Sequence, residues 1–200
     1  IKLLSEQDQL GRALSEMTRA LREGAAETAR QDWLKTGQTQ LHNQMSGEPD
    51  LVTLAKQVIT FLTSYVEAAV GMFYLFKETN QGKSSLKLLA SHAHTRRHHL
   101  DHDLHLGEGI IGQAALEGHH IVLTQVPNDY IPWDKPPLQQ VLAMPFRYEQ
   151  QLKGVMELGF FQPLTDVQLE FLQQVMPSIG IAVNTAQSRT QMQELLRRVR

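Results

Sequence analysis

Midway along this 200-residue chain stands Leu106-Gly107-Glu108-Gly109-Ile110-Ile111-Gly112-Gln113-Ala114, the stretch that decides its fold. The three glycines permit a tight turn into a short helix at residues 110–116, because glycine tolerates backbone conformations that side chains forbid. Gly118 then closes that helix. The spacing also satisfies G-x-G-x-x-G, but dinucleotide sites follow a buried strand in a βαβ unit, and this stretch follows a polar, His-rich segment. We therefore expect a structural turn.

Strand-like segments lie on both sides of this short helix. Residues 69–76 and 86–94 are rich in residues that favour strands, and the turn residues 80–83 between them predict a hairpin. Three further strands are expected at residues 120–124, 140–148 and 154–161. The order of helix, strands, short helix, strands and helix predicts an α+β fold with an antiparallel sheet flanked by helices.

The N-terminal residues 1–46 contain no Pro and predict one long helix. Apolar side chains recur there at alternating three- and four-residue spacings, as in a coiled-coil seam. The seam positions are Leu3, Gln7, Leu10, Leu14, Met17 and Leu21. The pattern fades at Gly24, where we expect a phase change or a break. One half of an ordinary helical hairpin is the alternative interpretation.

Two further helices flank the strands. Asp50 predicts the N-cap of a helix that begins at Leu51, and Thr165 with Gln168 predicts a capping box for the last helix. That last helix carries two apolar stripes, one to pack on the sheet and one to meet another helix. The first comprises Leu169, Leu172, Met176, Ile179, Val183 and Ala186, and the second comprises Ile181, Thr185, Ser188, Met192, Leu195 and Val199. Pro177 predicts a kink.

These segments resemble the GAF domain family over residues 50–187. The matching stretches are residues 70–76, 88–92, 106–114 followed by Gly118, 121–123, 126–129, 141–146, 154–158 and 171–186. The resemblance implies a GAF-like sheet and a sensor domain at residues 47–187, between an N-terminal signalling helix at residues 1–46 and a C-terminal coiled-coil linker at residues 188–200.

Residues 5–20 are similar to the second helix of a HAMP relay module. This similarity implies the cytoplasmic part of a membrane-anchored receptor, in which a HAMP module precedes the domain and an output module follows it. The order resembles sensor histidine kinases of two-component systems, including hybrid ones, although a chemoreceptor or a diguanylate cyclase parent stays open.

The flanking helices are expected to form a parallel homodimer. We predict that its contacts include Leu10, Leu14, Met17, Leu21, Met192, Leu195 and Val199.

Composition excludes several classes of function. The formal net charge is −2, which leaves no basic excess for binding nucleic acid. The apolar runs are shorter than the roughly 20 residues that span a bilayer, so we expect no direct membrane contact. The chain has no Cys and no G-x-S-x-G motif, so no nucleophile is visible and we expect this fragment not to be an enzyme. By resemblance, the missing Cys also excludes thiol-dependent methionine sulfoxide reductases and covalent bilin attachment.

The GAF resemblance implies that a small effector binds between the sheet and the segment that crosses it. The candidate ligand-binding residues are His92, His94, Ile111, Tyr130, Trp133, Met144, Phe146 and Met156. Tyr130 and Trp133 could equally fill the pocket and complete the core. We expect no cofactor, and the effector is a small molecule whose identity the sequence leaves open.

Six histidines crowd positions 92–105. Imidazole ligands suit zinc, nickel, copper or iron, which makes His98, His102 and His105 weak metal candidates. Clustered imidazoles could instead sense pH, because they titrate near neutrality. The simplest alternative is a solvated loop without a role in binding.

We therefore predict a sensory or relay module that binds a small effector or passes a signal through dimeric helices. A ligand-free dimerisation domain is the first alternative. Metal or pH sensing through the His-rich loop is the second.

Overall fold

The structure is a computed structural model that describes residues 2–78, 84–93, 103–127 and 136–198, with side chains from Asp8 onward. The chain divides into two compact units, residues 1–38 and residues 39–200. A single helix, α1 (Lys2–Met45), runs through the first unit and into the second. This helix continues through Gly24, so a break there is wrong, and the alternative of a phase change stays a prediction. A single glycine costs a helix only about 1 kcal/mol, which the flanking turns tolerate.

Helix α2 (Leu51–Tyr65) begins where the sequence predicted. The Asp50 carboxylate accepts hydrogen bonds from the backbone amides of Val52 and Thr53, each at 3.0 Å. The Thr53 hydroxyl, followed by the Thr53 amide, holds the pKa of Asp50 below its usual value. The predicted N-cap is therefore confirmed.

Within the described residues, six strands form one sheet in the order β3-β2-β1-β6-β5-β4, and each neighbouring pair is antiparallel. The strands are β1 (Val70–Glu78), β2 (Ser84–His92), β3 (Leu104–His105), β4 (Ile121–Leu123), β5 (Gln140–Tyr148) and β6 (Gln151–Phe160). The α+β architecture predicted from the sequence is confirmed. Strand β3 was missed, because two residues inside a polar segment are too few to show a strand pattern.

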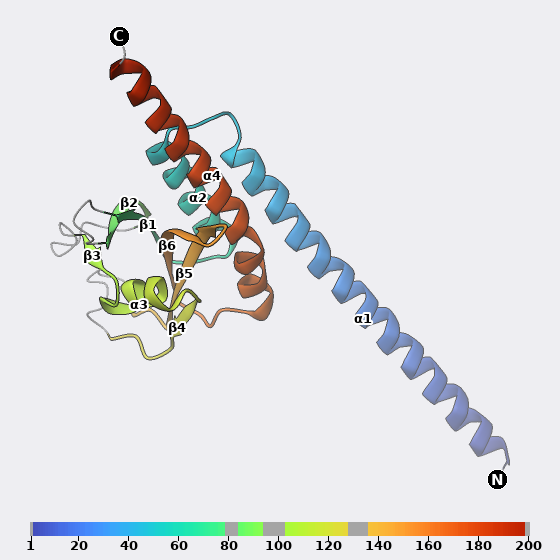
Figure 1. The fold of residues 1–200 in the computed structure, drawn as a ribbon. Coiled ribbons are helices and arrows are strands. Elements are labelled where there is room, and N and C mark those ends of the chain that lie inside the picture. The colour runs from blue at the N-terminus through green and yellow to red at the C-terminus, as the bar shows by residue number, and fades with distance from the viewer. Residues whose placement is uncertain (1, 79–83, 94–102, 128–135, 199–200) are drawn as a thin grey trace. The chain divides into compact units, whose positions relative to one another are not determined.

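Helices cover both faces of this sheet (Figure 1). On one face lie α2 and α4 (Asp166–Arg198), and a Cβ added at Gly71 of β1 would meet Ile59 and Thr63 of α2. On the other face lies the short helix α3 (Gly109–Glu117), whose Ile111 and Ala114 share a buried cluster with Met72 of β1. We call these the helix face and the α3 face.

The last helix, α4, begins with the predicted capping box. The Thr165 amide donates to the Gln168 side chain at 2.9 Å, and the Gln168 amide donates to the Thr165 hydroxyl at 3.3 Å. The first predicted stripe of α4, which we call the inner stripe, packs against the domain. Its residue Leu169 is half-buried, and the other five are buried: Leu172, Met176, Ile179, Val183 and Ala186. The helix continues through Pro177, which lies on its exposed side.

Gly180 allows α4 to approach the sheet closely. A Cβ at this position would overlap the backbone carbonyl oxygen of Arg147 at the end of β5. Helix α4 can therefore lie this near to the β5–β6 hairpin only if position 180 has no side chain.

Replacing Gly180 with Ala should destabilise the domain by about 1 to 3 kcal/mol, because the methyl group forces α4 away from Arg147. Thermal unfolding followed by circular dichroism measures this change. Gly24→Ala is the matched control, since nothing lies within 4 Å of a Cβ at that helical position. An equal or higher midpoint for Gly180→Ala than for the unmodified chain would contradict the predicted overlap.

Candidate functional site

Glycines position α3 over the sheet. Gly107 and Gly109 have φ angles of 82° and 62°, in the region where side chains are disfavoured. A Cβ at Gly112 would overlap the backbone carbonyl of His105, and Gly118 ends α3 with a φ of 74°. The glycine pattern therefore serves backbone geometry at the start and end of α3, as the sequence analysis expected.

The centre of the α3 face holds a buried carboxylate. Glu157 of β6 pairs in register with Met72 of β1 and Ala143 of β5, and both of those residues belong to the apolar cluster beneath α3. The Glu157 residue is only 2% exposed. Taking a carboxylate out of water is costly, so a strand built for packing alone would favour an apolar residue at this position. Among the described residues, Glu157 is the only charged residue that is buried, which makes it the candidate polar group on the α3 face.

The predicted ligand-binding residues do not gather on one face. Met144 and Met156 are partners across β5 and β6, and Phe146 lies 4.9 Å from Phe73 between ring centroids. His92 pairs with Gly71, which faces α2. These four candidates therefore belong to the helix face.

Ile111 is the one described candidate on the α3 face. His94, Tyr130 and Trp133 lie outside the described residues. Ligand contact by any of the eight stays a prediction.

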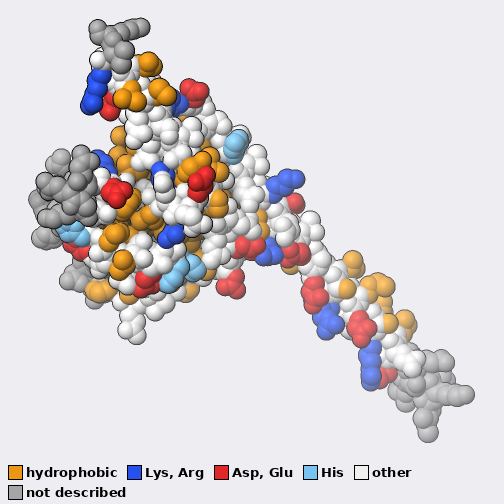
Figure 2. Space-filling model, in the orientation of Figure 1, with side chains coloured by type: hydrophobic (Ala, Val, Ile, Leu, Met, Phe, Trp, Pro, Cys, Tyr) orange, Lys and Arg blue, Asp and Glu red, His pale blue; other side chains and the backbone are white. Residues whose placement is uncertain are grey.

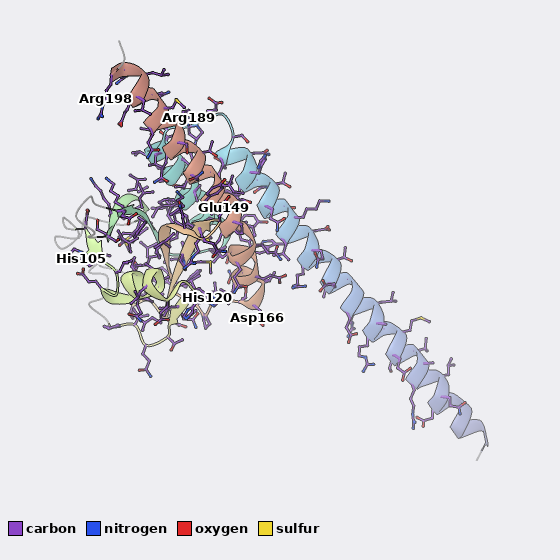
Figure 3. The ribbon with its side chains drawn as sticks, viewed as in Figure 1. His105, His120, Glu149, Asp166, Arg189 and Arg198 are labelled. Atoms are coloured by element: carbon purple, nitrogen blue, oxygen red, sulfur yellow. The ribbon has the colours of Figure 1, made fainter. Side chains whose placement is uncertain are left out.

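Two of the three metal candidates lie outside the described part of the chain. His98 and His102 fall in residues that the structure does not describe, and His105 lies exposed in β3. The His105 amide donates to the Glu108 carboxylate at 2.9 Å (His105 is labelled in Figure 3). Among the described residues, no group of three or more His, Asp or Glu side chains could hold a metal ion.

A second candidate site lies on the outer side of α4. Ile181, Met192 and Leu195 are each more than half exposed. With Thr185 and Ser188 they form a line at alternating spacings of four and three residues, which we call the α4 stripe. The predicted dimer residue Val199 lies outside the described residues.

Helix α1 carries a similar exposed line. Leu10, Leu14, Met17 and Leu21 are between 55% and 69% exposed, and we call them the α1 stripe. Figure 2 shows hydrophobic side chains on the surface near the C-terminal end of α4 and along the N-terminal half of α1. In the described part of the chain, no helix is long and apolar enough to cross a membrane.

Comparison with known proteins identifies a family. A sequence profile described as the GAF domain matches residues 48–184, which include α2, the whole sheet, α3 and most of α4. No curated protein sequence matches the chain significantly.

Several solved structures share the fold at low sequence identity. The GAF domain of a phosphoenolpyruvate-protein phosphotransferase from Acinetobacter is 17% identical with a TM-score of 0.64, and the alignment covers 82% of this chain and 98% of that one. The corresponding domain from Coxiella burnetii is 15% identical with a TM-score of 0.65, covering 78% and 96%. A free methionine-R-sulfoxide reductase from Neisseria meningitidis is 14% identical with a TM-score of 0.55, covering 78% and 91%.

Glu157→Gln should leave the domain folded, with a free energy of unfolding within about 1 kcal/mol of the unmodified chain, if the carboxylate is kept for a ligand. A carboxylate that holds the fold together through a buried ion pair would instead cost about 3 to 5 kcal/mol when neutralised. Urea unfolding distinguishes the two results. The control is Glu149→Gln, at the exposed turn between β5 and β6 (labelled in Figure 3), which should change stability by less than about 0.5 kcal/mol.

Proposed function

The chain belongs to the GAF domain family, and on that premise we propose that it is a sensory relay module whose α4 pairs with α4 of a second copy. The observation that carries this proposal is the division of α4 into two apolar surfaces. Its inner stripe is buried against the domain, whereas the α4 stripe is exposed and continues beyond the last buried residue, Ala186.

The spacing of the α4 stripe favours a helical partner. Alternating steps of four and three residues keep a seam facing a second helix, as in a coiled coil. Burying Met192 and Leu195 would contribute about 1.5 to 3 kcal/mol for each side chain, which the isolated chain does not gain. A second copy offers the same stripe, so a two-fold axis along the seam would bury both stripes at once.

We further propose that a small effector binds at the α3 face, with Glu157 as its polar anchor. A ligand shifts the paired helices only if it binds one arrangement better than the other, with a coupling of about 1 to 3 kcal/mol. Arg147 offers a path for that coupling. Its guanidinium lies against Gly118 at the end of α3, and its backbone carbonyl lies against Gly180 of α4.

The parent protein is, in our proposal, a membrane-anchored receptor with a HAMP module before this domain and a histidine kinase after it. The similarity of residues 5–20 to a HAMP helix supports this proposal, in which the domain would lie in the cytoplasm and would have no catalytic activity of its own. The solved relatives belong to a phosphotransferase and a reductase, so the fold by itself does not favour one output over another.

A ligand-free relay is the second candidate. The α4 stripe favours this alternative, because two copies can pair along it without a bound ligand. Native mass spectrometry of the purified chain tests this alternative, because a dimer of bare chain mass would favour it and additional retained mass would identify an effector or a metal.

Replacing Met192 and Leu195 together with Glu should convert the dimer to a monomer, because four like charges would meet in the seam. The control variant, Thr190→Glu with Gln193→Glu, adds the same charge on the side of the helix opposite the α4 stripe and should stay dimeric. Sedimentation velocity measures both, and circular dichroism verifies that each variant is folded. Unchanged association of the Met192 and Leu195 variant would contradict the proposed seam.

A further inference from the structure

Arg189 marks the place where α4 leaves the domain. Every described residue from Thr190 onward is exposed, whereas Arg189 is partly buried, with 27% of its side chain exposed. Figure 3 labels Arg189 and Arg198, which stand on either side of this boundary. The contacts of Arg189 therefore set the position from which the free end of α4 extends.

Those contacts all reach one short turn, residues 46–50, between α1 and α2. The Arg189 guanidinium donates a hydrogen bond to the Pro49 carbonyl. That bond uses Nη2, and the second terminal nitrogen of Arg189, Nη1, forms an ion pair with Glu48 Oε2 at 3.3 Å. Glu48 is 86% exposed, so the ion pair contributes little to stability, and the bond to the fixed carbonyl does more to position α4.

The turn itself is tied to both of the helices that it joins. The Ser46 hydroxyl donates to the His42 carbonyl in the last turn of α1 at 2.8 Å, and Asp50 caps α2. Between them, Gly47 and Glu48 have φ angles of 88° and 57°, a conformation that few residues adopt, and Pro49 has a φ fixed by its ring. The Pro49 carbonyl is therefore held at a defined place relative to the end of α1.

We propose that Arg189 is a positioning residue that couples the C-terminal end of α1 to the point where α4 leaves the domain. This route runs from His42 through Ser46 and Pro49 to Arg189, and it crosses neither α3 nor the sheet. A change at the end of α1 would then reach the α4 stripe whether or not an effector is bound. The biological use of this coupling rests on the proposed relay function, but the coupling is a property of a single chain.

A double-mutant cycle read by hydrogen exchange tests the coupling on the full chain. Gln40→Gly, at an exposed position, weakens the last turns of α1, and Arg189→Ala removes the proposed link. Mass spectrometry follows amide exchange in residues 187–198. Gln40→Gly should raise that exchange by roughly threefold when Arg189 is present and leave it unchanged when Arg189 is replaced.

Matched variants separate coupling from general loosening of the helix. Arg197→Ala removes the same kind of side chain from the exposed part of α4 and should preserve the full response to Gln40→Gly. Glu48→Gln removes the ion pair but keeps the bond to Pro49, so it should preserve most of the response. Thermal unfolding of each variant verifies that the domain stays folded.

Additive effects of Gln40→Gly and Arg189→Ala on amide exchange would overturn the inference. It would also be overturned if Gln40→Gly alone left exchange in residues 187–198 unchanged. Sedimentation of the same samples distinguishes this failure from failure of the proposed function. A dimer with additive effects refutes the coupling alone. A monomer with a non-additive cycle supports the coupling and refutes the proposed pairing.

Discussion

The packing of α4 on the sheet is the interaction on which the other features of this domain depend. The inner stripe of α4 is buried at Leu172, Ile179 and Val183. Because Gly180 has no side chain, the helix can lie against the backbone of Arg147. Because the α4 stripe is displaced around the same helix, it must remain on the surface when the inner stripe is buried. One helix thus packs against the sheet and also carries the exposed α4 stripe, through which we propose that a second copy pairs.

The two faces of the sheet divide the remaining tasks. On the helix face, α2 and α4 complete a closely packed core that includes Phe73 and Phe146. The α3 face places Glu157 beneath the short helix that the glycine-rich stretch positions. Arg147 contacts elements on both sides, through Gly118 and Gly180. The helix face therefore carries the packing of α2 and α4, whereas the α3 face carries the buried carboxylate that we propose as a ligand contact.

Much of the fold could be predicted because it follows from local signals. Asp50 and Thr165 marked two helix starts, Gly118 marked a helix end, and the glycines around position 109 indicated the turn that places α3. The two stripes of α4 could also be predicted from the sequence, because helical periodicity separates buried from exposed positions within one helix.

The candidate site was harder to predict, for a geometric reason. Alternate residues of a strand face opposite sides of the sheet, and the sequence does not say which side α3 covers. Met144, Phe146 and Met156 share one parity and face α2 and α4, whereas Glu157 has the other parity. A single acidic residue in the apolar stretch from Val155 to Leu158 was the signal that could have identified Glu157. The contact between Arg189 and Pro49 joins positions that are 140 residues apart in the sequence. No local sequence pattern could have predicted it.

In our proposal, two copies pair in parallel and in register along the α4 stripe. Cysteine cross-linking tests it most directly, because the chain contains no Cys. A parallel seam places the two copies of position 195 opposite each other, within the roughly 7 Å between Cα atoms that a disulfide requires. We expect Leu195→Cys to form a covalent dimer rapidly under mild oxidation, whereas Gln193→Cys, on the side of α4 opposite the stripe, should not. Equal rates for the two variants, or no cross-link for either, would contradict it.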